Sequence, residues 1–120
     1  TLGNWWCRDF EYSSDDLLDI VSQFEKREIP LSVLLLDYTW HPSKLSDGTT
    51  LFSGYSFHKK LFPNPSDFIS QLHEKNIHLG VHFNPAQGIY SHENHYMDIA
   101  SYFQVTDNKI IAFDPLNPIL

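Results

Sequence analysis

The sequence has a single cysteine, Cys7, so a framework of internal disulfides is excluded. Positive charge is also scarce, because eight Lys and Arg residues stand against fifteen Asp and Glu residues, for a formal net charge of -7. This balance leaves no basic patch that could follow a phosphate backbone, and we expect no nucleic-acid partner. No apolar run is long enough for a transmembrane helix or a signal-peptide core, so we expect no membrane partner. The compartment stays open.

What the chain does contain is typical of a globular protein. Of the 120 residues, 42% are hydrophobic and 15% are aromatic, which is enough to fill one core of ordinary size. The sequence starts at Thr1 rather than at a methionine and stops at Leu120 without a polar tail. We therefore expect residues 1–120 to be a fragment of one domain in a longer polypeptide.

The most apolar stretch is 30–36, which runs from Pro30 through an aliphatic sequence and stops abruptly at Asp37. It lacks polar alternation, as expected for a parallel-sheet strand that is covered on both faces. Ligands collect at the carboxyl ends of such strands, and the period of two places Asp37 on the face of Val33 and Leu35. A carboxylate there either binds a ligand or caps the following loop, and both interpretations stay open at this point.

The flanking sequence predicts strands that alternate with helices. A short aromatic strand over 2–8 precedes a helix over 13–28, whose N-cap is Ser13. A long polar and aromatic loop, 41–61, follows the aliphatic strand, and a second helix starts at the Asn64 cap with Pro65 in its first turn.

The next segment, 77–83, alternates apolar residues with Gly80 and His82, as a third strand would, and Asn84 follows on the polar face. The apolar face is expected to pack against helices. A weaker helix over 92–103 and a short apolar run over 109–113 complete the pattern.

Three strand-helix repeats are typical of an α/β protein, either an open doubly wound sheet or the first part of a (β/α)8 TIM barrel. No glycine-rich phosphate loop follows the first strand, which favours the barrel. We therefore predict the N-terminal portion of a barrel, incomplete, with about three βα repeats. The residues at or just past the strand ends are candidates to line one mouth: Trp6, Asp37, Tyr38, Trp40, His82 and Asn84.

The seven histidines raise the alternative of a metal site, since four of them and one glutamate lie within a short stretch: His78, His82, His92, Glu93 and His95. Their spacing does not match a known ligand motif, because residues 92–95 (HENH) are one residue short of the zinc-protease helix motif. Solvated or hydrogen-bonded histidines are the favoured interpretation. We expect neither a metal nor a cofactor.

Six segments occur in an order and at a spacing that resemble glycoside hydrolase family 31. They are LGNWWCR (2–8), IPLSV (29–33), DYTWH (37–41), GYSF (54–57), LFPNP (61–65) and NPAQGI (84–89). That family contains α-glucosidases, α-xylosidases and related retaining enzymes on a (β/α)8 barrel. The resemblance implies that Asp37 binds hydroxyls of the sugar at the cleavage subsite and that Tyr38 lines it. Flanking aromatic residues can cover the apolar face of a sugar ring.

The resemblance also implies that the nucleophile and the acid/base aspartate lie on later strands, beyond Leu120. No catalytic residue is then expected within the chain, which by itself should be inactive; its partners would be an α-linked carbohydrate and the remainder of its own barrel. Four residues depart from the family pattern and affect substrate preference more than fold: Asp9, Thr39, Asn84 and Gln87. The alternative to an enzyme that hydrolyses α-glucosides or related α-glycosides is a carbohydrate-binding or scaffold protein on the same barrel that has lost hydrolysis.

Overall fold

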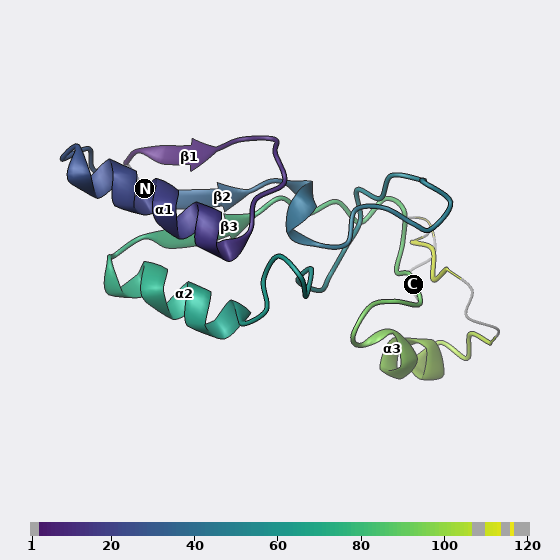
Figure 1. The fold of residues 1–120 in the computed structure, drawn as a ribbon. Helices are drawn as coiled ribbons and strands as arrows, with labels where there is room; N and C mark the ends of the chain where they lie inside the picture. Colours follow the sequence, from purple (N-terminus) through teal and green to yellow (C-terminus); the bar gives the residue numbers. More distant parts are fainter. Residues whose placement is uncertain (1–2, 107–109, 114–115, 117–120) are drawn as a thin grey trace. The chain divides into compact units, whose positions relative to one another are not determined.

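Three short parallel strands form one sheet in the order β1-β2-β3, with their arrows pointing the same way in Figure 1. They are β1 (Trp5–Cys7), β2 (Val33–Leu36) and β3 (His78–Val81). The register pairs Trp6 with Leu34 and Leu34 with Leu79. The prediction that the first three strands are parallel neighbours is confirmed.

This computed structural model describes residues 3–106, 110–113 and 116. The chain divides into two units: unit 1 comprises Thr1–Trp40 with Phe57–His82, and unit 2 comprises His41–Ser56 with Phe83–Leu120. The sheet belongs to unit 1, together with helix α1 (Ser14–Lys26), the 3-10 turn η1 (Tyr38–Trp40) and helix α2 (Pro65–Glu74). Unit 2 contains helix α3 (Tyr96–Tyr102) and long loops.

Both long helices begin where the sequence predicts. At α1 the Ser13 hydroxyl accepts the N–H of Asp16 at 3.2 Å, and the Asp16 carboxylate accepts the N–H of Ser13 at 2.9 Å. This reciprocal pair satisfies two N–H groups that have no partner within the helix, and it holds the pKa of Asp16 below its ordinary value. At α2 the Asn64 side chain accepts the N–H of Asp67 at 3.3 Å, and Pro65 occupies the first turn.

The two helices end on residues with left-handed backbone. Glu28 has φ 55° just after α1, and Asn76 has φ 57° just after α2, where Asn is one of the residues that adopt this conformation most readily. The Ile29 N–H then donates to Phe24, and the Ile77 N–H donates to Leu72. These bonds satisfy carbonyls of the last helical turn and turn the chain into the next strand.

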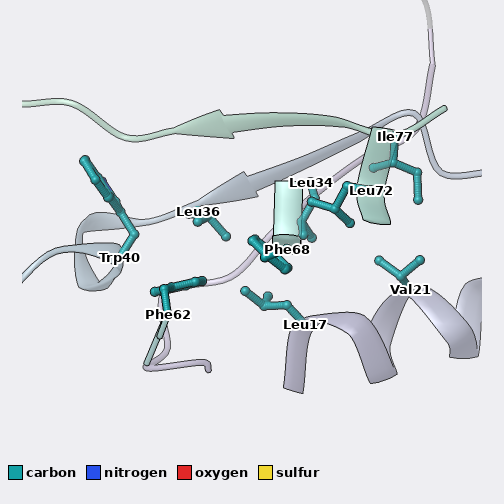
Figure 2. Close-up of a cluster of buried hydrophobic side chains, with 9 residues drawn as sticks. All are labelled: Leu17, Val21, Leu34, Leu36, Trp40, Phe62, Phe68, Leu72 and Ile77. Atoms are coloured by element: carbon teal, nitrogen blue, oxygen red, sulfur yellow. The ribbon is translucent and has the colours of Figure 1, made fainter. Parts of the chain in front are cut away.

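The core of unit 1 lies between the helices and one face of the sheet (Figure 2). Leu17 of α1 and Phe68 of α2 point toward Leu34 and Leu36 of β2. The full buried cluster is Leu17, Val21, Leu34, Leu36, Trp40, Phe62, Phe68, Leu72 and Ile77. Full burial of one such side chain contributes roughly 1.5–3 kcal/mol, so this cluster is the main source of stability in unit 1.

The third strand is shorter than the alternation predicts. Leu79 packs against the core as expected, but Val81 is exposed and Phe83 lies beyond the strand in unit 2. Gly80 is paired with Leu35, and a Cβ there would lie 2.8 Å from the Leu35 side chain. The polar face of the alternation is therefore the face opposite the helices.

Unit 2 has a small core of its own: Ile89, Tyr96, Ala100 and Ile111. Ile89 and Ile111 form an isolated antiparallel bridge. The helix predicted over 92–103 is confirmed only for its second half, because Glu93 and Asn94 lie in turns before α3. Lys109, the first residue of the predicted run over 109–113, lies outside the described residues, whereas Ile111 is buried.

Candidate functional site

Two predicted site residues lie next to each other at the carboxyl ends of neighbouring strands. Asp37 follows β2 and His82 follows β3, and Oδ1 of Asp37 lies 4.0 Å from Nδ1 of His82. The His82 backbone N–H also donates to the Leu36 carbonyl at 2.7 Å, which extends the strand pairing to this point. Their side chains are 27% and 47% exposed, so both can be reached by a solute. The predicted convergence of these two residues is confirmed.

The Asp37 carboxylate has both a structural contact and spare acceptor capacity. Its Oδ1 accepts the N–H of Tyr38 at 2.8 Å, and its backbone carbonyl accepts the N–H of Trp40 at 3.1 Å. Asp37 therefore caps η1, which is one of the two interpretations left open by the sequence. Oδ2 accepts no hydrogen bond from the described residues, so a second function for the same carboxylate is compatible with the cap.

Trp40 lies in the core of unit 1. Its side chain is 7% exposed, packs edge-on against Phe57, and donates its indole N–H to the His82 carbonyl at 2.9 Å. This hydrogen bond ties the turn after β2 to the end of β3. Trp40 therefore supports the strand ends, and its predicted role in sugar binding remains a prediction.

The two adjacent tryptophans of β1 face opposite sides, because successive side chains of a strand alternate. Trp6 packs against the core and lies 5.6 Å from the ring of Tyr12, whereas Trp5 is exposed. Trp6 and Asp37 line one hollow in unit 1, together with Arg8, Phe10, Tyr12, Leu17, Leu35, Leu36, Thr39, Trp40 and Phe62. Its free volume of about 10 Å³ has room for about one water molecule, so a sugar ring would have to contact Asp37 outside this hollow.

The electrostatic field of Asp37 reaches the neighbouring strand. Partial burial, followed by the charges of Asp37 and Asp9, raises the pKa of Cys7 at the end of β1. The charges of these two carboxylates thus act on the end of β1. Thr39, one of the four departures from the family pattern, donates its hydroxyl to the Phe10 carbonyl at 3.0 Å and so has a structural contact here.

Asn84 belongs to unit 2, and its side-chain oxygen accepts the N–H of Ala86 at 2.9 Å. This contact forms a turn just after β3. Its predicted proximity to Asp37 remains a prediction. The same turn contains Gln87, whose side-chain oxygen accepts the backbone N–H groups of Phe52 and Ser53 in the loop after β2. In the sequence Gln87 is visible only as a departure from the family pattern, because no neighbouring residue indicates these distant partners.

Unit 2 also contains buried polar side chains whose burial the sequence analysis did not predict. The Glu93 side chain is 3% exposed, and within the described residues neither of its carboxylate oxygens accepts a hydrogen bond, although His92 Nε2 lies 3.5 Å from Oε1. Burial, and then the charge of Glu93, raises the pKa of Tyr55. His41 is fully buried, and a Cβ at Gly54 would overlap its ring, so glycine is required there.

No three His, Cys, Asp or Glu side chains gather as metal ligands within residues 3–106, 110–113 and 116. His95, one of the four histidines of the metal hypothesis, instead lies 3.4 Å from Asp98 on the surface. In the same described part of the chain, no helix has the length and apolar character needed to cross a membrane.

Comparisons with known proteins place these strands in a larger fold. An α-xylosidase from Saccharolobus solfataricus is 27% identical over 72% of this chain, and an α-galactosidase, Mel36A, from Lactobacillus acidophilus is 29% identical over 70% of it. The chain spans 11% of the length of each of these relatives. A crystal structure of a family 31 α-xylosidase from a soil metagenome, complexed with xylose, matches with a TM-score of 0.63 and 22% identity. That match covers 85% of this chain and 14% of the xylosidase.

The strongest comparison is with the family as a whole. The model of the glycosyl hydrolases family 31 TIM-barrel domain matches residues 1–115, which is nearly the whole chain. Three parallel strands with helices between them agree with part of such a barrel. The chain therefore belongs to glycoside hydrolase family 31, as a part of its TIM-barrel domain.

Proposed function

We propose that this chain is the N-terminal part of the catalytic barrel of a retaining α-glycoside hydrolase and that it supplies sugar-binding residues. The observation that carries the proposal is Asp37, a partly exposed carboxylate at the carboxyl end of β2, 4.0 Å from His82 on the adjacent strand. In TIM barrels the residues at this end of the strands bind the substrate. The family resemblance is independent support, because it assigns sugar hydroxyls to the same aspartate.

The chemistry of Asp37 suits a sugar ligand. Oδ1 is held by the Tyr38 N–H, which fixes the carboxylate orientation, while Oδ2 can accept a hydroxyl of a sugar. Hydrogen bonds to a charged group contribute about 1.5–3 kcal/mol each, and a fixed carboxylate loses little freedom when it forms them. His82 can bind a neighbouring hydroxyl through either ring nitrogen. Tyr38 and Trp6 are proposed to contribute apolar contact, and Trp40 to hold the two strand ends together.

The bond-breaking chemistry is proposed to belong to the rest of the barrel. Retaining hydrolysis uses two carboxyl groups roughly 5–5.5 Å apart, one as nucleophile and one as acid and then base. Asp37 is proposed as a binder and not as either of these. The Asp37 carboxylate would nonetheless favour the positive charge that develops on the sugar ring in an oxocarbenium-like transition state.

The substrate is proposed to be an α-glycoside. The similar proteins include an α-xylosidase and an α-galactosidase, and α-glucosides complete the proposed class of substrates. The test is to incubate the complete protein that carries this chain with the p-nitrophenyl α-xyloside, α-galactoside and α-glucoside, with the β-xyloside as control. Release of nitrophenol from at least one α-glycoside, with retention of the anomeric configuration by NMR, is the expected result.

Two outcomes would contradict the proposal. Cleavage of only the β-anomer would place the protein outside this function. Binding of the sugars by calorimetry without any turnover would instead support the alternative of a carbohydrate-binding protein that has lost hydrolysis.

A further inference from the structure

The loop after β2 presents an aromatic ring to solvent from a buried stretch of backbone. Phe52 is 44% exposed, whereas its neighbours Leu51 and Ser53 are fully buried. Buried residues on both sides fix the direction in which the Phe52 side chain leaves the loop. A single exposed aromatic side chain is common on protein surfaces, so the exposure alone assigns no function.

The second observation is how the backbone of Phe52 is held. The side-chain oxygen of Gln87 accepts the N–H of Phe52 at 2.6 Å and the N–H of Ser53 at 3.1 Å. The side-chain nitrogen of Gln87 donates to the Thr50 carbonyl at 3.4 Å, and its backbone N–H donates to the Ser53 hydroxyl at 2.9 Å. Gln87 therefore makes four hydrogen bonds to three residues of the loop, Thr50, Phe52 and Ser53.

A second set of contacts closes the same loop on itself. The Leu51 N–H donates to the Ser43 carbonyl at 2.8 Å, and Lys44 and Thr50 form an antiparallel bridge. All of these residues belong to unit 2, so the arrangement is a property of that unit. The Phe52 ring is thus carried by backbone whose freedom has already been lost on folding, and a ligand that contacts the ring need not order the loop.

We propose that Phe52 is a further substrate-binding residue, which stacks on a carbohydrate ring, and that Gln87 is the positioning residue that fixes it. The inference rests on the proposed function. One face of a pyranose ring carries C–H groups, and a flat aromatic side chain covers such a face with apolar contact that an aliphatic side chain matches poorly. The loop follows the carboxyl end of β2, where barrel enzymes build their substrate sites. One ring is too small an apolar surface for a stable protein interface.

The test of Phe52 uses the complete protein and the α-glycoside that it cleaves best. Phe52→Leu keeps an apolar side chain of similar bulk but removes the flat face, whereas Phe52→Tyr keeps the face. We expect Phe52→Leu to raise KM about 3- to 10-fold with kcat within about twofold, and Phe52→Tyr to keep KM within about twofold. The matched control is Tyr102→Leu, which removes an aromatic ring that is 81% exposed in the same unit and should leave KM unchanged.

The test of Gln87 is a double-mutant cycle. Gln87→Leu removes the side-chain hydrogen bonds and should raise KM by a factor similar to that of Phe52→Leu. Added to Phe52→Leu, it should change KM by less than about twofold, because its effect passes through the ring that is already gone. Gln87→Glu keeps an oxygen acceptor for the N–H groups of Phe52 and Ser53 and should restore most of the affinity, which also covers the case in which Gln87→Leu fails to fold.

The outcomes separate this inference from the proposed function. An active wild type whose KM is unchanged by Phe52→Leu, or for which Phe52→Tyr is as impaired as Phe52→Leu, would overturn the stacking role of Phe52. If the increase in KM of the double variant equals the product of the increases caused by Phe52→Leu and Gln87→Leu, the positioning role of Gln87 would be overturned. A wild type that neither cleaves nor binds any of the three α-glycosides would overturn the proposed function, and this inference with it.

Discussion

The indole N–H of Trp40 donates to the backbone carbonyl of His82 at 2.9 Å, across 42 residues of sequence. The bond joins the turn after β2 to the end of β3, and it lies beside the Asp37 carboxylate that we propose as a sugar ligand. A buried side chain thus adds to the strand pairing in holding His82 beside Asp37.

Trp40→Phe tests this connection. Phenylalanine keeps an aromatic ring in the core but loses the N–H, so the His82 carbonyl loses its donor and a gap is left in the packing. We expect a loss of about 1–3 kcal/mol in the free energy of unfolding of the complete protein, measured by denaturant titration. The control is Trp5→Phe, because Trp5 is exposed and should cost little. Equal losses for the two variants would show that the contact of Trp40 is not a stabilising one.

Asp37→Asn separates the two functions of this carboxylate. Asparagine keeps an oxygen for the Tyr38 N–H, and so keeps the cap of η1, but it loses the negative charge. If Asp37 binds sugar hydroxyls, kcat/KM on the preferred α-glycoside should fall roughly 10- to 150-fold, equivalent to about 1.5–3 kcal/mol, with the unfolding transition unchanged. Asp19→Ala on the exposed surface of α1 is the matched control. Unchanged kinetics in Asp37→Asn would leave Asp37 with its capping role alone.

The capping box of α1 predicts a specific dependence on pH. Hydrogen bonds from Ser13, first from its hydroxyl and then from its backbone, hold the pKa of Asp16 below its ordinary value of 3.8. A carboxyl group whose pKa is lower in the folded state contributes stability above its unfolded pKa and loses it as the pH falls through its folded pKa. This contribution should therefore be complete at neutral pH, begin to fall near the ordinary pKa of 3.8, and disappear only below the lower pKa of the folded state.

Ser13→Ala measures that contribution. At pH 7 the substitution should lower the free energy of unfolding by about 0.5–2 kcal/mol, as expected for the loss of an N-cap. The difference between variant and wild type should shrink in acid, since the bond to the Asp16 carboxylate is weakened in both proteins there. Ser22→Ala, within α1 and away from its start, is the control. A difference that is the same at pH 7 and in acid would contradict the role of the Asp16 charge.

The chain of 120 residues, purified alone, should be catalytically silent and poorly stable. A TIM barrel typically takes about 250 residues and eight strands, and a three-stranded part leaves strand edges without partners. The measurement is an assay on the p-nitrophenyl α-glucoside and α-xyloside beside the complete protein, together with denaturant unfolding. Turnover at a rate similar to that of the complete protein, or a cooperative monomeric transition of ordinary stability, would be incompatible with this expectation.

Local signals in the sequence determined the elements and their order. Ser13 with Asp16, and Asn64 with Pro65, place the starts of the two long helices to within a residue, because a cap and its helix are formed by neighbouring residues. The aliphatic run that ends at Asp37 predicts the buried strand β2. Where the strands are shorter than predicted, as at Phe83, the alternation continued past the point at which backbone pairing stops.

Only the tertiary structure decided which side chains form hydrogen bonds with residues far away in the sequence. The sequence predicts that Trp40 lines the mouth. In the structure its ring is buried in the core of unit 1 and its N–H donates to the His82 carbonyl. Gln87 was visible only as an unusual residue, until the fold brought it to the backbone of Phe52 and Ser53. Periodicity and capping depend on residues a few positions apart, whereas these contacts join residues more than thirty positions apart and exist only once the loops have closed.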